Sequence, residues 1–253
     1  MARPPPLRAP AASPDRRTVV TGLAGSMLGQ VAIGGAAGGK ATGAAAQAID
    51  VDLALVLAVD CSWSVDAYEY QLQMQGLAAA FRRPEIQRAI ASGEAGRIIV
   101  ANVQWSHEAN QVLSVPWTLV ADSVDADAFA AELEATPRQV VDGATAIGAV
   151  MEYCAGLLRT SPVAARRKVI DISSDGRSNR GLHPTVARDR VIAGGMTING
   201  LAILDEWPTL DLYFQRQVVG GPNHFVIVAN DYEAYGRAIY RKLLQEISGP
   251  GVA

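Results

Sequence analysis

The 253-residue chain is long enough for one sizeable hydrophobic core or at most two small ones. Its hydrophobic content of 49% is ordinary for a globular protein, and its formal net charge of -3 argues against a nucleic-acid-binding surface. Residues 1–48 hold five basic residues and one acid, so removing them takes the balance from 22 basic against 25 acidic residues to 17 against 24. The remaining body is acidic, which suits a cation site and disfavours binding to anionic membranes.

Residues 1–48 have the pattern of an export signal. Arg16 and Arg17 precede a moderately apolar, glycine-rich stretch at 19–33, and Ala46-Gln47-Ala48 forms a small-x-small cleavage site. Paired arginines before a weakly hydrophobic segment are typical of twin-arginine signals. The alternative is a retained membrane anchor, although the glycines disfavour a spanning helix. We therefore expect a periplasmic or secreted protein, with one domain at 49–253 and no membrane insertion once the signal is removed.

The first half of this domain alternates strand and helix patterns. The apolar run at 52–59 predicts a strand covered on both faces. Ser64 is a candidate N-cap for a helix that carries an apolar stripe and that Pro84 ends or breaks. Strands at 97–105 and 111–120 are expected to pair as a hairpin at a sheet edge, with Asn102 and Gln104 on a polar side. A short helix follows at 125–135.

The second half repeats the alternation more regularly. We expect helices at 146–158, 184–193, 207–218 and 231–247, and strands at 168–173, 196–204 and 223–229. This order specifies an α/β fold: a doubly wound, mostly parallel sheet with helices on both faces and one antiparallel edge strand. In such sheets ligands bind at the carboxyl ends of the strands.

Polar side chains stand where the first strand ends. Asp60, Ser62 and Ser64 occupy alternate positions directly after the apolar run, so a tight loop lets their oxygens converge. Oxygen ligands of this kind suit hard cations such as Mg²⁺. Asp60 could instead serve only as a helix cap, but a cap needs one side-chain oxygen and this loop offers three.

Two later stretches supply similar groups. Thr145 precedes the helix at 146–158, and Asp175 follows the strand at 168–173. Thr145 could be only an N-cap, and Asp175 could belong to an ordinary Asp-Gly turn. Asp171, inside that strand, needs a partner if buried; the sequence leaves open whether it is structural or lies beside the metal.

These residues resemble the metal-ion-dependent adhesion site (MIDAS) of von Willebrand factor type A domains. That site combines DxSxS, a distant threonine and an aspartate in a T/S-D-G turn, here Asp60, Ser62, Ser64, Thr145 and Asp175. The resemblance covers residues 49–247. The stretches at 171–176, 197–201 and 218–221 look more closely like a bacterial group of exported type A-like proteins of unassigned function.

The resemblance implies a binding function. A Mg²⁺ ion, or Mn²⁺ or Ca²⁺, is held by the five side chains, and an Asp or Glu of a protein partner completes its shell. The alternative is a metal-dependent hydrolase or phosphatase at the same site, although the sequence lacks the common catalytic motifs. A third possibility is a scaffold with an inactive site. Cys61 and Cys154 are expected to be separate core thiols, with a disulfide not excluded by their exported location.

Overall fold

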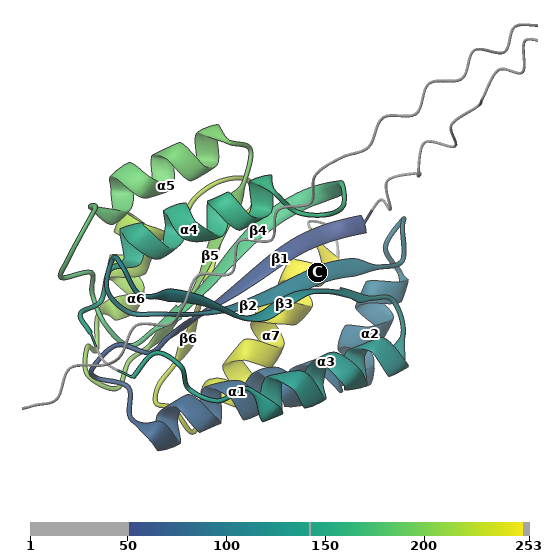
Figure 1. Cartoon of the computed structure of the whole chain (residues 1–253), viewed down its shortest axis with the longest axis horizontal. Coiled ribbons are helices and arrows are strands. Elements are labelled where there is room, and N and C mark those ends of the chain that lie inside the picture. The colour runs from purple at the N-terminus through teal and green to yellow at the C-terminus, as the bar shows by residue number, and fades with distance from the viewer. Residues whose placement is uncertain (1–50, 142, 250–253) are drawn as a thin grey trace, which may run out of the picture. The chain divides into compact units, whose positions relative to one another are not determined.

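The computed structural model describes residues 51–141 and 143–249 (Figure 1). The predicted export signal lies outside these residues. The strands are β1 Val51–Asp60, β2 Ile98–Trp105, β3 Gln111–Val120, β4 Ala165–Ser174, β5 Thr197–Ile203 and β6 Val226–Ala229. The helices are α1 Ala67–Phe81, α2 Pro84–Ala91, α3 Ser123–Ala135, α4 Ile147–Arg159, α5 Pro184–Ala193, α6 Leu210–Tyr213, the π-helix η1 Phe214–Val218 and α7 Tyr235–Ser248. Within this part of the chain, no helix is both long enough and apolar enough to cross a bilayer.

The sheet confirms the predicted fold class. Its strand order is β3-β2-β1-β4-β5-β6, and every neighbouring pair is parallel except β2 with β3, which form the antiparallel edge hairpin. β1 lies at the centre because it pairs with both β2 and β4. The carboxyl end of β1 is therefore flanked by two other strands.

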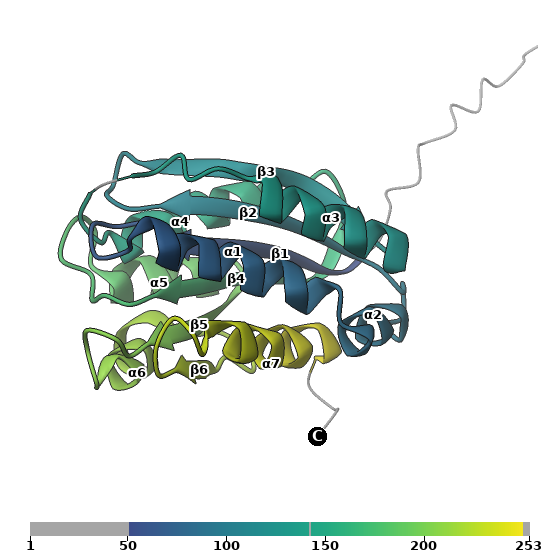
Figure 2. The same ribbon diagram turned by 90° about the horizontal axis from the view of Figure 1, so that it is seen from below.

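Alternate side chains of β1 pack in two separate hydrophobic cores. Leu53, Leu55 and Leu57 pack in the core that includes α1, α2, α3 and α7, whereas the small side chains Ala54, Val56 and Ala58 lie in the core beneath α4 and α5. Figure 2 shows α1, α3 and α7 side by side on one face of the sheet, and Figure 1 shows α4 and α5 on the other. Helices therefore cover both faces, as a continuous apolar strand requires.

The start of α1 differs from the prediction. Ser64 is not its N-cap: the cap is Asp66, whose carboxylate accepts a hydrogen bond of 2.8 Å from the Glu69 N–H, while the Glu69 side chain accepts one of 2.7 Å from the Asp66 N–H. This reciprocal pair is a capping box. It leaves the Ser64 hydroxyl available for the site. Pro84 does more than end α1, since it begins a second helix, α2.

The expectation of a polar side on β2 is wrong. Asn102 and Gln104 are fully buried. The Gln104 amide donates hydrogen bonds of 2.9 Å to the Tyr70 hydroxyl and to the Pro137 carbonyl, and its oxygen accepts from the Gln139 N–H at 2.7 Å. Partners from distant segments make burial of this amide possible, and sequence periodicity does not show them.

The last elements are shorter than expected. The helix predicted at 207–218 is a single α turn followed by a π-helix, the last strand begins at Val226, and α7 begins at Tyr235. Asp231 does not start α7, because its carboxylate accepts from the Ala234 N–H at 2.7 Å within a preceding turn. Cys61 and Cys154 are buried free thiols, which confirms the expectation of separate core residues.

A buried charged network holds α7 against the sheet. The ammonium of Lys242 lies 2.7 Å from an oxygen of Asp171 on β4 and 2.6 Å from Oε1 of Glu246, and all three residues are buried. The Asn199 amide donates to the same Glu246 oxygen at 2.9 Å. Asp171 is therefore structural. Its pKa is raised to about 7, chiefly by burial and next by the charge of Glu246, while Lys242 opposes the shift.

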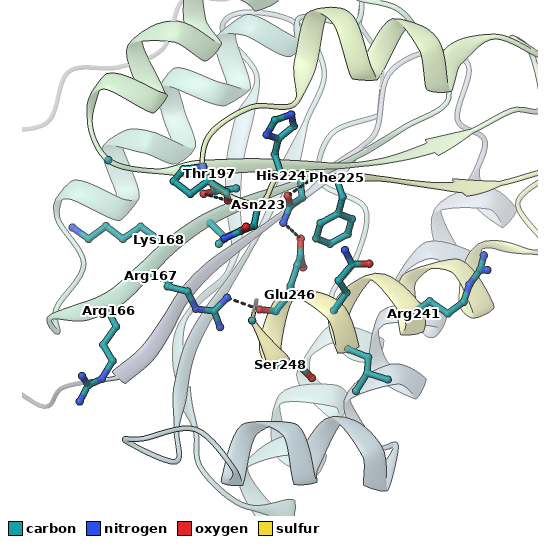
Figure 3. Close-up of a pocket in the computed structure, with 17 residues that line it drawn as sticks. Arg166, Arg167, Lys168, Thr197, Asn223, His224, Phe225, Arg241, Glu246 and Ser248 are labelled. Atoms are coloured by element: carbon teal, nitrogen blue, oxygen red, sulfur yellow. Dashed lines mark hydrogen bonds between the residues drawn. The ribbon is translucent and has the colours of Figure 1, made fainter. Parts of the chain in front are cut away.

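The carboxyl end of α7 is fastened to β4 as well. The Arg167 guanidinium donates a hydrogen bond of 2.7 Å to the carbonyl of Glu246 (Figure 3) and one of 3.0 Å to that of Ile247. A cation at a helix carboxyl end also suits the helix dipole. These groups border a cavity of about 900 Å³ at the amino ends of β4 and β5, which is the edge of the sheet opposite to Asp60.

Candidate metal centre

Asp60 is the last residue of β1 and is fully buried between β2 and β4. Its Oδ1 accepts a hydrogen bond of 2.7 Å from the Ser62 N–H, and its Oδ2 accepts one from the Ser174 hydroxyl at the end of β4. The carboxylate is therefore fixed by its own loop on one side and by the neighbouring strand on the other. A side chain held this way is preorganised for a ligand.

Ser62 and Ser64 extend the site from the same loop. Their hydroxyl oxygens lie 3.4 Å apart, and Ser64 donates a hydrogen bond of 2.9 Å to Oδ1 of Asp175. That bond joins residues 111 positions apart in the sequence. It brings the loop after β1 directly against the loop after β4, as expected for the carboxyl ends of adjacent parallel strands.

Thr145 reaches the same place from a third loop. It is not a helix cap, since α4 has no side-chain cap bond at its N-cap, Ala146. Its N–H donates to the Asn179 amide oxygen at 3.0 Å, and its carbonyl accepts from the Asn179 N–H at 2.9 Å. A Cβ added at Gly176 would lie 3.3 Å from the Thr145 hydroxyl. The hydroxyl thus rests against the Asp175-Gly176 turn, where a larger side chain would be crowded.

The two carboxylates of the site interact unfavourably. Burial raises the pKa of Asp60 to about 7, with the nearby charge of Asp175 as the second cause, and hydrogen bonds from Ser174 and Ser62 oppose the shift. Burial also raises the pKa of Asp175, and its bond from Ser64 opposes that shift. A divalent cation between the two groups would relieve both effects, because opposite charges attract more strongly in a medium less polar than water.

The donor chemistry fits a hard cation. The five side chains offer carboxylate and hydroxyl oxygens only, which is the ligand type that Mg²⁺ and Mn²⁺ prefer. Among the described residues, no cluster of three or more His, Cys, Asp or Glu side chains could hold a metal. Zinc sites of the ordinary nitrogen and sulfur type are thus not found there. The metal-binding role of the five side chains stays a prediction.

Three further residues support the site without having been predicted. Ser174 holds Asp60, Tyr232 lies buried beside Asp175, and the Arg138 guanidinium donates at 3.1 Å to the Cys61 carbonyl, in the loop after β1. The only sequence signal among them was the position of Ser174 beside Asp175. Tyr232 and Arg138 lie in segments whose approach to the site depends on the complete fold.

Comparisons with known proteins place this arrangement in a family. Residues 50–251 match the family described as "Protein of unknown function (DUF1194)". The chain belongs to the DUF1194 family. A comparison of the DUF1194 chain with curated proteins finds no match.

Solved structures show the same fold. The DUF1194 chain is similar to proximal thread matrix protein 1 of the mussel byssus, with a TM-score of 0.57 and 16% identity over 79% of this chain and 49% of the other. It is also similar to a von Willebrand factor type A protein from Catenulispora acidiphila, with a TM-score of 0.53 and 19% identity over 80% of this chain and 44% of the other. A third similar structure is the pilus adhesin SpaC from Lactobacillus rhamnosus GG, with a TM-score of 0.53 and 13% identity over 78% of this chain and 31% of the other.

These similarities identify the fold as von Willebrand factor type A-like. The DUF1194 chain spans half or less of the length of those structures. A second structure of the byssus protein, with a TM-score of 0.55 and 15% identity over 79% of this chain and 48% of that one, is described as having a zinc-occupied MIDAS motif.

Proposed function

We propose that this DUF1194 chain is an exported, metal-dependent protein-binding module. Asp60, Ser62, Ser64, Thr145 and Asp175 hold Mg²⁺, Mn²⁺ or Ca²⁺, and an Asp or Glu side chain of a partner completes the coordination. The main support is that three loops meet at one edge of the sheet: the Ser62 and Ser64 hydroxyls lie 3.4 Å apart, Ser64 bonds to Asp175, and the Thr145 hydroxyl lies against the Asp175-Gly176 turn.

The chemistry of the donor set explains why a partner carboxylate would bind. Three of the five donors are uncharged hydroxyls, and Mg²⁺ prefers six oxygen ligands. Five protein oxygens therefore leave a position for an outside ligand. An anion gains most there, because a dication held mainly by neutral groups retains the power to attract negative charge.

The similar structures support this class of function. They include a pilus adhesin and a byssus protein described with a metal in its MIDAS motif. Export rests on the pattern of residues 1–48, and an acidic mature body is compatible with it. A metal-dependent hydrolase at the same site is the competing function, which a screen with generic phosphoesters would detect.

Thermal unfolding with and without metal tests the proposal. A cation at 100 times its dissociation constant should stabilise the fold by about 2.7 kcal/mol, which corresponds to a rise in Tm of roughly 5–11 °C for a domain of this size. Asp60→Asn should abolish the rise, because it removes one of the two anionic donors. The matched control is Asp127→Asn, an exposed aspartate on α3, which should leave the rise intact.

The partner is tested separately. Immobilised protein should capture exported proteins with Mg²⁺ and release them with a chelator. If saturating Mg²⁺ and Mn²⁺ change neither the Tm nor the capture, the binding function proposed for the site is wrong.

A further inference from the structure

The surface around the candidate metal centre exposes apolar side chains. Large hydrophobic residues that are exposed in the described chain include Trp63 in the loop after β1, Val141 in the loop before α4, and Trp207 in the loop after β5. These loops lie at the carboxyl edge of the sheet, toward the α6 side in Figures 1 and 2. Exposed apolar groups gathered in one place mark interaction sites more often than chance.

Trp63 is the most prominent of them. It stands between Ser62 and Ser64, and its side chain is 84% exposed. Its backbone is nevertheless fixed, because the Trp63 N–H donates a hydrogen bond of 2.9 Å to the Gly143 carbonyl and the Val65 N–H donates one of 3.1 Å to the Ser62 carbonyl. A rigid loop thus presents an aromatic ring to solvent directly beside two predicted metal ligands. Tryptophan held in this way is a common anchor of protein interfaces.

A stack of aromatic and cationic groups faces the same region. The Arg177 guanidinium lies 4.9 Å from the ring centre of Trp207 and 5.6 Å from that of Tyr213, and it donates to the Thr209 hydroxyl at 2.9 Å. It has no ion pair with a carboxylate in the described part of the chain. Arg180, nearby, is paired with Glu108 at 3.0 Å. The charge of Arg177 is therefore fixed in position and open to an outside anion.

One groove joins these features to the metal centre. It has a volume of about 870 Å³, and its lining includes Trp63, Ser64, Thr145, Arg177 and Trp207. A ligand group at the metal would thus have the Trp63 ring and the Arg177 guanidinium as neighbours along the same groove. This places an apolar contact and a cationic contact near a single carboxylate.

We propose that the groove binds an extended peptide segment of a partner, in which the metal-bound Asp or Glu is flanked by an apolar residue and by a second acidic residue. The apolar side chain packs on Trp63, and the second carboxylate pairs with Arg177. The proposal rests on the metal-binding function proposed above. It adds which side chains must flank the metal-bound carboxylate in the partner.

A peptide fits these features better than a sugar acid does. Sugar rings stack on an aromatic face whose other side is supported by protein. Trp63 is 84% exposed, so little protein supports its ring, and it suits insertion among the side chains of a partner. The groove is also lined by Arg180, which is paired with Glu108, and by the carboxylate Glu206. Arg177 and the metal are therefore the positive groups left for a ligand, and an acidic residue placed at Arg177 is complementary in charge.

A small peptide set tests the proposal with the Mg²⁺-loaded protein. The peptides have the form Ac-Gly-X-Asp-Y-Gly-NH₂, with Gly, Leu, Phe, Glu or Lys at X and Y, and calorimetry measures their Kd. Peptides with one apolar and one acidic flank should bind about tenfold more tightly than the peptide with two glycine flanks, equivalent to ~1.4 kcal/mol. Lysine at either flank should weaken binding.

Variants assign each preference to its residue. Trp63→Ala should remove the preference for an apolar flank, and Arg177→Gln should remove the preference for an acidic one. The matched controls are Tyr68→Ala and Arg190→Gln, which should change neither flank preference. Tyr68 is 57% exposed, the Arg190 side chain is 62% exposed, and both residues lie outside the groove. The Tm rise with Mg²⁺ should persist in all four variants.

The outcomes separate this proposal from the function on which it rests. A wild-type protein that binds no metal contradicts both. Metal binding with equal or undetectable affinity for all peptides overturns the peptide proposal alone, as does binding of an oligoglucuronate that depends on Trp63 in the absence of any peptide preference. Loss of metal binding in Trp63→Ala would show a structural role for this ring and overturn its assignment.

Discussion

Replacing Lys242 by methionine should destabilise the protein strongly. The ammonium of Lys242 is fully buried and lies 2.7 Å from Asp171 and 2.6 Å from Glu246. Methionine fills a similar volume but leaves two carboxylates in the interior without their cation. Breaking a buried ion pair on one side costs about 3–5 kcal/mol, which corresponds to a fall in Tm of roughly 6–20 °C for a domain of this size.

The cost should depend on pH in a defined direction. Without Lys242 the folded protein must neutralise the buried Asp171 carboxyl, and protonating a group above its ordinary pKa costs about 1.4 kcal/mol per pH unit. For Asp171 the ordinary value is 3.8. The folded state of the variant therefore binds protons that the unfolded state has released, and its stability rises as the pH falls toward that value. In the wild type the pKa of Asp171 is already about 7, so below pH 7 both proteins gain stability in the same way. The deficit of the variant should therefore shrink between pH 8.5 and 7.0, by up to ~2 kcal/mol, and stay nearly constant at lower pH.

Urea unfolding of both proteins at pH 8.5 and 7.0 measures these differences. The control is Arg190→Met, which breaks an exposed pair with Glu152 at 3.3 Å and should cost less than about 1 kcal/mol at either pH. If Lys242→Met costs no more than this control, or if its deficit is no smaller at pH 7.0 than at pH 8.5, the buried network does not carry the energy assigned to it.

Three further predictions concern other parts of the chain. Gly148→Ala should destabilise by about 1–3 kcal/mol in urea unfolding, because its Cβ would lie 2.1 Å from the Leu182 carbonyl oxygen; an unchanged midpoint would contradict that packing. Asp66→Ala should cost about 1 kcal/mol by removing the N-cap of α1, whereas Ser64→Ala, at the cap position expected from sequence, should not shorten α1 in amide exchange. N-terminal sequencing of the exported protein should begin at or near Ile49, and an exported product that still begins at Met1 would exclude cleavage.

The parts of the fold that depend on local pattern were predictable. A continuous apolar run marked β1 as a strand covered on both faces, and alternating elements specified a parallel sheet, whose geometry brings the residues after β1 and β4 together. Asp60 and Asp175 could therefore be placed at one edge from sequence alone. Their proximity in the structure follows from topology, which local pattern determines well.

Two of the failures share a physical cause. Gln104 was assigned to a polar surface because its burial depends on Tyr70 and on the Pro137 carbonyl, which are far away in the sequence. Asp171 could not be assigned because its partner Lys242 lies on the last helix. The cap of α1 was predicted at Ser64, whereas the reciprocal bonds between Asp66 and Glu69 make Asp66 the cap. The first two concern polar side chains whose partners are fixed by tertiary structure, whereas the cap was a local error, because the partner of Asp66 lies three residues away in the sequence.

The separation in sequence of the residues that meet at the metal centre has a consequence for folding. Ser174 and Asp60 are 114 residues apart, and Ser64 and Asp175 are 111 apart. Closing loops of this length costs chain entropy before any contact repays it. These contacts therefore form only when the central strands have already joined, so a cation at the candidate site would bind the folded protein and not partly folded chains. Such an ion would mainly slow unfolding, and so lengthen the lifetime of the folded protein, without increasing the folding rate.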